Sequence, residues 1–337
     1  MLEADRRIAN LTRVVESGYY SSRNEYQINV EQALFQLIGH PHVYWEDALN
    51  ARIDIVKGEF ALQLTQKRGQ IELKLAPALN TEGDVCWLKE TPSRIAVYSV
   101  SNEVRKIASI IGVGVRMPET AKAELVAAIE VVAPHLAIHS DLPEMAAHIE
   151  TIAADGMLYA HLLPLKEGLR LQFLMRPLPE GAWFPPGKGA ANVLGEKDGK
   201  TLQASRELKK EKAQLRQVLD ICKTLAQAEQ EGEEWQFAHP QDCLEILSEL
   251  KEIPSETLQM IWPEGERFRL RGNRSMQNMR LGIKRQGDWF IADGEIELDD
   301  GRILALRELI QLSSNSQGRF LHLGEQDYLA LTEAMRK

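Results

Sequence analysis

Residues 294–301 read GEIELDDG, and this stretch predicts the architecture of the C-terminal part of the chain. From Glu295 to Asp299, acidic residues alternate with apolar ones, which is the period of a half-buried strand. The Asp300-Gly301 pair follows directly. Because glycine accepts a positive φ and aspartate hydrogen-bonds nearby backbone, this pair predicts a tight turn.

Downstream of this turn the pattern predicts a compact α+β unit. Ile303, Leu306 and Ile310 recur on one face of an expected helix, and residues 318–324, GRFLHLG, indicate a strand between two glycines. Residues 328–335 then predict a closing helix with no Gly, Asn or Pro after it. We therefore expect the chain to be one part of a longer protein.

Upstream, residues 151–337 are expected to form one region of mixed helices and strands. Residues 157–176 alternate as a hairpin, and residues 177–201, rich in Pro, Gly and Lys, are expected to be a loop. Residues 205–229 have near-heptad apolar spacing and predict one long helix, followed by a second helix over 240–251. Short strands are expected from 258 to 299.

Residues 1–150 are expected to form the other region. Residues 1–38 predict two helices, and residues 40–100 alternate with turn signals, which predicts an antiparallel β-meander. Ser101 is expected to cap a helix through Ile110, and Pro118 suits the first turn of another. The expected fold is therefore α+β and multidomain, with N-terminal helices and a meander and a C-terminal mixed module containing one long helix.

Composition excludes several classes of protein. The chain has 337 residues, 44% hydrophobic and 26% charged, which is ordinary for a globular protein. A net charge of −9 argues against a generally basic surface, so any nucleic-acid contact must be local. Three cysteines without a Cys-x-x-Cys pair indicate neither a disulfide framework nor a zinc site. The charged start lacks a signal peptide and no run is long enough to span a membrane, so we expect a cytoplasmic protein.

A basic stretch is the main candidate for nucleic-acid binding. Between Arg267 and Arg285 there is no acidic residue. At the two-residue period of a strand, three arginines share one face while Phe268 and Leu270 point to the core. Cations in a row can contact successive phosphates and displace counterions. The candidates are Arg267, Arg269, Arg271, Arg274, Arg280, Lys284 and Arg285.

The same stretch has a structural interpretation, which the pattern favours. Glu295, Glu297 and Asp299 form an acidic row on a nearby strand. Opposite charges across paired strands stabilise a sheet by about 0.2–1 kcal/mol each. Nucleic-acid contact and a protein partner remain as the alternatives. The long helix adds a basic side of its own, which is more typical of a solvated face; its cations are Arg206, Lys209, Lys210, Lys212, Arg216 and Lys223.

Residues 185–189, PPGKG, superficially resemble a phosphate-binding loop. That loop needs Gly-x-x-x-x-Gly-Lys-Ser/Thr, but Ala182 stands at the first glycine and Gly189 at the hydroxyl position. Two prolines also remove amide donors. We therefore expect a surface loop and no nucleotide hydrolysis, with Lys188 as a further candidate for contact with DNA or a partner.

Other candidate chemistry is weak. The spacings His40-Pro-His42 and His135-x-x-x-His139 lack a completing ligand set, so no metal site is expected. No catalytic triad or other catalytic residue is evident, and no cofactor or small-molecule substrate is indicated. Five aromatic residues gather in the last quarter, where packing is the usual reason; they are Trp262, Phe268, Trp289, Phe290 and Phe320.

A family resemblance links these segments. The order DWF, GEIELDDGR, GRFLHLG and YLALTEAMRK resembles the region preceding the motor in large bacterial Swi/Snf-family helicase-like proteins. It extends back through residues 262–265, 186–189, 176–177 and 139–143, and it covers most of the chain, more convincingly after about residue 133. The order and spacing carry the resemblance, because each motif alone is weak.

This resemblance implies a helicase-associated, regulatory region whose partner is the C-terminal ATPase core of the same parent protein. The parent would hydrolyse ATP with magnesium and move on double-stranded DNA. The ATPase itself is absent from this sequence, so the chain is expected to be non-catalytic and to position or regulate the motor. The alternative is a self-contained protein-interaction module without nucleic-acid contact.

Overall fold

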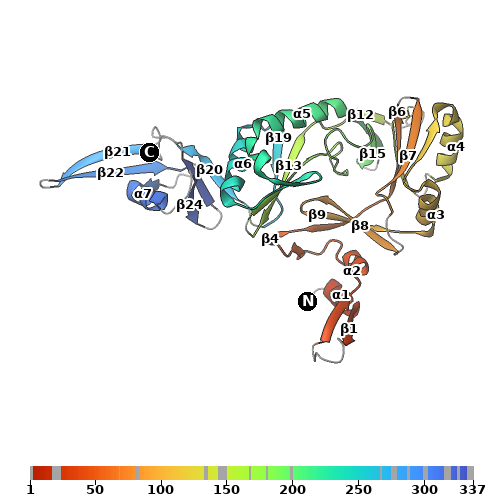
Figure 1. The fold of residues 1–337 in the computed structure, drawn as a ribbon, viewed down its shortest axis with the longest axis horizontal. Helices are drawn as coiled ribbons and strands as arrows, with labels where there is room; N and C mark the ends of the chain where they lie inside the picture. The colour runs from red at the N-terminus through yellow and green to blue at the C-terminus, as the bar shows by residue number, and fades with distance from the viewer. Residues whose placement is uncertain are drawn as a thin grey trace.

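The computed structural model shows an α+β protein built from many small sheets (Figure 1). It describes residues 3–16, 24–67, 69–79, 83–132, 136–142, 150–166, 168–179, 181–197, 200–265, 268–274, 279–286, 289–298, 303–314, 320–324 and 327–331. Strand residues outnumber helical ones, 43% to 30%, and no single long helix dominates the described part of the chain. None of the helices in these ranges is long and apolar enough to cross a membrane.

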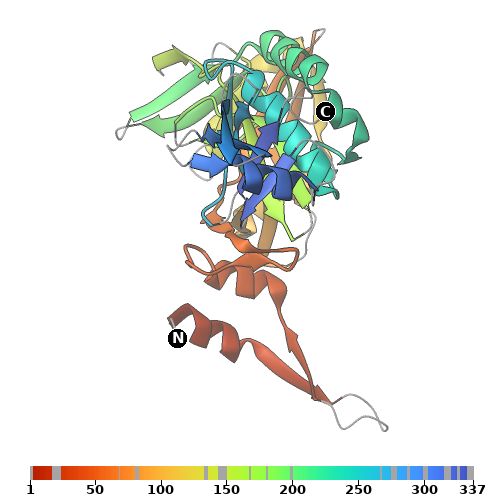
Figure 2. The same ribbon diagram turned by 90° about the vertical axis from the view of Figure 1, so that its left-hand side faces the viewer.

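The N-terminus forms an arm that extends away from the body (Figure 2). Its elements are α1 (Glu3–Asn10), β1 (Thr12–Glu16), β2 (Asn24–Ile28) and α2 (Val30–Gln36). The two expected helices are present, but an antiparallel hairpin lies between them. The β-branched run at Thr12, Val14 and Val15 favours strand over helix. His40 Nε2 lies 3.0 Å from Asp5 Oδ1 and ties α1 to the chain after α2.

The expected single meander over 40–100 is wrong, because its strands are distributed over three sheets. One sheet pairs β3 with β4, the second has the order β5-β9-β8, and the third has the order β10-β7-β6-β11. The β5–β9 and β11–β6 pairs are parallel. The strands are β3 (Tyr44–Trp45), β4 (Ala48–Arg52), β5 (Asp54–Lys57), β6 (Ala61–Lys67), β7 (Gln70–Ala76), β8 (Val85–Thr91), β9 (Arg94–Ser99), β10 (Val115–Pro118) and β11 (Ala137–Ser140).

Two helices close the core of this N-terminal region. The expected cap is confirmed, since Ser101 Oγ accepts a hydrogen bond from Val104 N at 3.2 Å and begins α3 (Asn102–Ile111). Pro118 ends β10 and precedes a 3₁₀ turn, η1 (Glu119–Ala121), that leads into α4 (Lys122–Val132). Leu125 and Ile129 of α4 are buried in the same apolar cluster as Leu64 and Ile71 of the sheet.

A five-stranded sheet of order β17-β18-β14-β13-β19 forms the centre of the molecule. Its main hairpin confirms the expectation for 157–176. The strands are β13 (Leu158–Leu165), β14 (Gly168–Met175), β17 (Glu229–Glu231), β18 (Glu234–Phe237) and β19 (Leu258–Ile261). Apolar residues of one face, including Leu171 and Phe173, pack against α5 (Leu208–Ile221) and α6 (Pro240–Glu252).

The expected long helix over 205–229 is wrong. The helix α5 has 14 residues and ends at Ile221, because the next residue, Cys222, has a φ of −80° and a ψ of 81°, which are not helical. A 3₁₀ turn, η3 (Lys223–Gln227), follows and turns into the core. The carboxylate of Glu249 accepts the Thr224 N–H at 3.1–3.2 Å. This side-chain acceptor and the burial of Leu225 stabilise the break in the helix after Ile221. The heptad spacing of apolar residues gives no sign of this break.

The expected loop over 177–201 is only half correct. Its second half is a hairpin of β15 (Asn192–Lys197) and β16 (Lys200–Ser205), extended by β12 (Glu150–Ala153) in parallel. The expected boundary between residues 150 and 151 stays a prediction. β12 begins at Glu150, and β11 contacts β15 across that boundary.

The C-terminal module consists of two small sheets and a helix. One sheet has the order β20-β25-β24 and the other β21-β22-β23. Its elements are β20 (Arg269–Arg274), β21 (Met279–Gln286), β22 (Trp289–Glu297), β23 (Ile303–Ala305), α7 (Leu306–Ser314), β24 (Phe320–Gly324) and β25 (Asp327–Leu331). The β22 and β24 strands confirm the alternating pattern, and the helix begins three residues later than expected.

The expected closing helix over 328–335 is wrong where the structure describes it. Residues 327–331 form β25, the central strand of its sheet, and residues 332–335 lie outside the described part. Leu329 and Leu331 are buried with Ile296 and Leu309. An apolar run this short fits both periods, so its spacing could not distinguish strand from helix.

Candidate functional site

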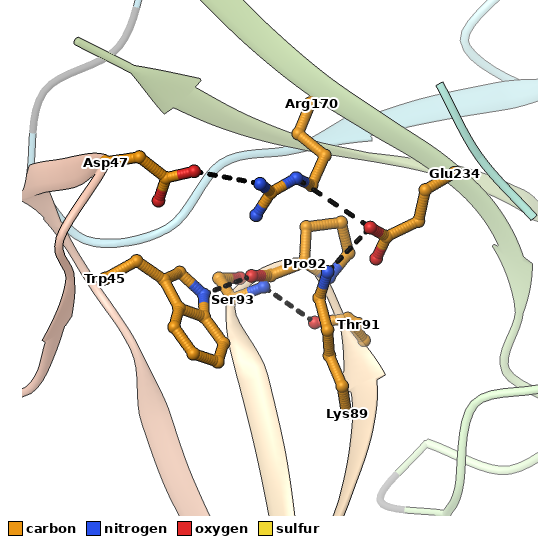
Figure 3. A network of polar contacts seen from close by, with 8 residues as sticks. All are labelled: Trp45, Asp47, Lys89, Thr91, Pro92, Ser93, Arg170 and Glu234. Atoms are coloured by element: carbon orange, nitrogen blue, oxygen red, sulfur yellow. Dashed lines mark hydrogen bonds and ion pairs between the residues drawn. The ribbon is translucent and has the colours of Figure 1, made fainter. Parts of the chain in front are cut away.

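A network of ion pairs joins the N-terminal region to the central sheet (Figure 3). Arg170 Nη2 lies 2.9 Å from Asp47 Oδ2, and Arg170 Nε lies 3.8 Å from Glu234 Oε2. Lys89 Nζ reaches the same Glu234 oxygen at 2.6 Å. We call these four residues, Asp47, Lys89, Arg170 and Glu234, the charged junction. Glu234 therefore holds two cations, Lys89 of β8 and Arg170 of β14.

The pleat of the central sheet explains why Arg170 reaches this junction. Its neighbours Leu169 and Leu171 are fully buried against the helices, so Arg170 lies on the opposite face. Its side chain is 16% exposed. The Lys166 N–H also donates to Asp47 O at 2.8 Å. Mostly buried charges need such partners, because an unpaired one would be costly to desolvate.

A second joint uses residues 139–142, HSDL, which belong to one of the motifs of the family resemblance. The Leu194 N–H donates to His139 Nδ1 at 3.0 Å, and the Ala191 N–H donates to Asp141 Oδ1 at 2.9 Å. The side chains of His139 in β11 and of Asp141 just after it thus accept two backbone N–H groups at the start of β15. Burial lowers the pKa of His139 to about 4, so its ring is neutral at pH 7 and able to accept.

The third joint fastens the segment before the C-terminal module to β4. The Arg52 N–H donates to Glu264 O at 2.8 Å, and the two side chains form an ion pair. Ala51 and Gly265 form an antiparallel bridge. A Cβ on Gly265 would lie 2.0 Å from Asn50 O, so only glycine allows this approach.

The PPGKG loop is closed by a buried ion pair. Arg206 donates to both carboxylate oxygens of Glu211 at 3.0 and 2.7 Å. The Gly187 N–H donates to Glu211 Oε2 at 2.8 Å. The Glu211 carboxylate thus already accepts the hydrogen bond of a backbone N–H that a phosphate-binding loop would donate to its ligand. Lys188 is paired with Glu233 at the surface.

This pair also corrects the expected basic side of the long helix. Arg206 precedes α5 and its side chain is fully buried, with Phe184 against the guanidinium at 4.6 Å. Its Nη1 donates to the carbonyl oxygens of Lys188 and Ala190. Arg206 therefore holds the loop onto the helix, whereas Lys209 and Lys210 are exposed.

The basic stretch is divided between two strands of the C-terminal module. Arg269, Arg271 and Arg274 lie on β20, where their Cα partners are Asp327, Leu329 and Leu331 of β25. Arg280, Lys284 and Arg285 lie on β21, and Arg267 falls outside the described residues. The inward pattern is confirmed, because Leu270 is buried and Phe268 packs against the central core.

The expected match between the basic and acidic rows is wrong for β20. The acidic row lies on β22, which pairs with β21 and β23, whereas β20 pairs with β25. One contact of the expected kind is formed by another cation, since Arg280 Nη1 lies 3.9 Å from Glu295 Oε1. Arg280 is 83% exposed. Asp299 lies outside the described residues.

The distal part of β21–β22 is a two-stranded ribbon. β23 pairs only with residues 295–297 of β22, so residues 289–294 pair with β21 alone. The ribbon extends from one end of the molecule, beyond α7 (Figure 1). We call the whole β21–β22 hairpin the basic ribbon, because β21 has three cations and no acid. Arg280 lies at its base, opposite Glu295.

The remaining candidates have structural contacts. Phe320 is buried in the central core, and Trp262 packs against it; the side chains of Trp289 and Phe290 are outside the described part. No group of three or more metal-binding side chains gathers within the described ranges. His42 N donates to His40 Nδ1 at 3.1 Å, which uses one ring nitrogen locally.

Sequence reasoning missed both the charged junction and a buried histidine on the neighbouring strand. His161 is 4% exposed, and its ring meets that of Trp183 at 4.3 Å. Burial, with Arg176 and Arg94 nearby, lowers the pKa of His161 to about 3. Polar residues at Arg170 and Gln172 inside an otherwise apolar strand were the available signal, since they indicate a second covered face.

Comparisons with known protein families, with curated proteins and with solved structures found no match to this chain.

Proposed function

We propose that this chain is an accessory, non-catalytic region of a bacterial Swi/Snf-like ATP-dependent DNA translocase. It would position or regulate the motor of the parent protein, and its basic ribbon would contact duplex DNA. The observation that carries the proposal is the basic ribbon, which extends from one end of an internally braced frame and has the exposed Arg280 at its base. The resemblance described from the sequence supplies the parent class.

The three joints support the positioning role. The charged junction, the His139–Asp141 contacts and the Gly265 bridge each connect segments that are far apart in the sequence. Residues from the motifs of the resemblance form two of these joints, and the Gly187 N–H of a third motif donates to the Glu211 carboxylate. A region that holds its parts in one arrangement is suited to restrain a neighbouring domain.

The DNA-contact part of the proposal depends on charge and exposure. Arg280 of β21 is 83% exposed, with one carboxylate at the long distance of 3.9 Å. Such a surface pair is worth about 0–1 kcal/mol and can be exchanged for phosphate contacts. A two-stranded ribbon also has dimensions that the major groove accepts.

Duplex binding by the full chain tests this contact. We expect Arg280→Glu combined with Lys284→Glu to weaken binding of a fluorescent duplex in anisotropy titrations. The slope of log Kd against log salt should fall by about one for each phosphate that the variant no longer neutralises. The matched control is Lys57→Glu combined with Lys106→Glu, two exposed lysines remote in sequence. Equal weakening by both double variants would contradict a ribbon-specific contact.

The accessory role has a separate test. We expect the purified chain to hydrolyse no ATP, with or without DNA, in a phosphate-release assay. Turnover that survives purification and is abolished in a Lys188→Ala variant would contradict the proposal. The outcome does not depend on DNA binding, so the two parts of the proposal can fail separately.

The alternative is a self-contained protein-interaction module without nucleic-acid contact. The Arg280–Glu295 pair favours it, because the ribbon neutralises part of its own charge near its base. If the chain binds no duplex even at low salt, this alternative replaces the DNA contact, and the bracing role of the joints is unaffected.

A further inference from the structure

A cavity of about 380 Å³ opens beside the charged junction. It lies between the β3–β4 turn, β8 and the β17–β18–β14 end of the central sheet. Trp45 forms one wall, and its indole is held by a 3.0 Å hydrogen bond from Nε1 to Pro92 O (Figure 3). The lining residues are Trp45, Asp47, Lys89, Arg170, Glu229, Gln230, Glu231, Glu234 and Gln236.

The lining has an excess of negative charge. Four carboxylates and two cations line the cavity, which leaves two negative charges in excess. Both cations are committed, because Lys89 and Arg170 contact Glu234 and Asp47. Across the described ranges, no ion pair joins Glu229 or Glu231 to a cation. The excess charge therefore lies on β17.

β17 is also an edge strand. It pairs with β18 on one side, and no described strand covers its other side. All three of its residues are exposed. Because Glu231 and Glu234 close a two-residue turn, alternation of the ladder directs the backbone N–H and C=O of Gln230 outward. Charged edge strands also discourage aggregation, but that role does not require an adjoining cavity with an aromatic wall.

We propose that the β17 edge and this cavity bind an extended, lysine- or arginine-rich peptide segment of a partner protein. The segment would add as a strand to β17, with backbone hydrogen bonds at Gln230 and alternate cations facing Glu229 and Glu231. One cationic side chain would enter the cavity against the Trp45 ring, where cation–π attraction adds to the carboxylate field. This inference is independent of the proposed DNA contact, which uses the basic ribbon and none of the residues that line this cavity.

Labelled peptides and the full chain test this docking surface. The probe is a short fluorescein-labelled peptide of alternating lysine and threonine, titrated by anisotropy at low ionic strength. A second peptide replaces alternate threonines by proline, which keeps the charge and removes backbone donors. The variant is Glu229→Gln with Glu231→Gln. The matched control is Glu150→Gln with Glu256→Gln, which removes two exposed carboxylates elsewhere.

We expect the lysine–threonine peptide to bind the native chain and to bind the β17 variant about tenfold more weakly. The control variant should retain native affinity, and the proline peptide should bind much more weakly than the probe. Amide exchange at residues 229–231 should slow when the probe is bound. Equal affinity for both variants, equal affinity of the proline peptide, or no binding at low salt would each overturn the proposal. So would full competition by spermine at equal charge, which would indicate general attraction of polycations.

Discussion

The arginine that holds the PPGKG loop in place and the arginine at the base of the basic ribbon have opposite environments. Arg206 beside the loop is fully buried, and its guanidinium contacts a carboxylate, two carbonyl oxygens and a ring. Arg280 on the ribbon is 83% exposed with one carboxylate at 3.9 Å. A cationic motif in a sequence therefore does not by itself identify a binding site. Burial and the number of internal partners decide whether the charge is structural or available.

The largest expected effect comes from breaking the buried pair. Glu211→Ala leaves Arg206 buried without its carboxylate, so we expect the free energy of unfolding, measured with urea, to fall by about 3–5 kcal/mol. Arg280→Ala should leave that free energy nearly unchanged. Replacing both partners, as in Arg206→Met with Glu211→Leu, should recover much of the stability. A Glu211→Ala variant as stable as the native chain would remove the contrast between the two arginines.

The Gly265 bridge gives the next effect. Gly265→Ala combines a φ of +123° with a Cβ 2.0 Å from Asn50 O, so we expect the free energy of unfolding to fall by about 2–4 kcal/mol. Gly69→Ala is the control, because its φ is +76° but nothing lies within 4 Å of the new Cβ. If Gly265→Ala and Gly69→Ala lowered the free energy of unfolding equally, the close approach of Gly265 to β4 would contribute nothing to stability.

The neutral histidine joint predicts sensitivity to acid. Burial lowers the pKa of His139 from 6.5 to about 4, so its contribution to stability is fully present above pH 6.5 and disappears as the pH falls toward 4. We expect it to cost about 2 kcal/mol by pH 5. His139→Asn keeps an acceptor that does not titrate, so its stability should decline less between pH 7.5 and pH 5. Parallel pH profiles for the two proteins would assign the acid sensitivity elsewhere, for example to His161.

The smallest effect concerns the first half of the basic stretch. Arg269→Glu with Arg271→Glu changes β20, which lies within the module, whereas the ribbon variants change β21. If both strands contact one duplex, we expect each double variant to weaken DNA binding by about tenfold, or about 1.4 kcal/mol. Weakening by the ribbon variant alone would restrict the contact to the ribbon. Circular dichroism of each variant would show whether β20 still folds.

Local signals in the sequence predicted local structure well. Ser101 caps its helix, residues 158–175 form the expected hairpin, and α6 (Pro240–Glu252) matches its pattern. These features depend on residues within a few positions of each other. The inward position of Leu270 was predicted for the same reason.

Features that depend on contacts between residues far apart in the sequence could not be predicted. The spacing at Ile55 and Ile95 indicates strands, but not that β5 and β9 pair in parallel. The break after α5 is stabilised by a hydrogen bond from the Thr224 N–H to Glu249, which lies 25 residues further along the chain. The charged junction draws on four residues that form no motif. For the candidate site, the sequence supplied the cations of the ribbon but not their pairing, because pairing depends on which strands become neighbours.

The short strand β4 (Ala48–Arg52) has a mechanical consequence. It contacts the β13–β14 hairpin through Leu163 and Leu165 and holds residues 264 and 265 ahead of the C-terminal module. A pull on that module is therefore transmitted to the N-terminal half through five residues, in parallel with the path through the central core.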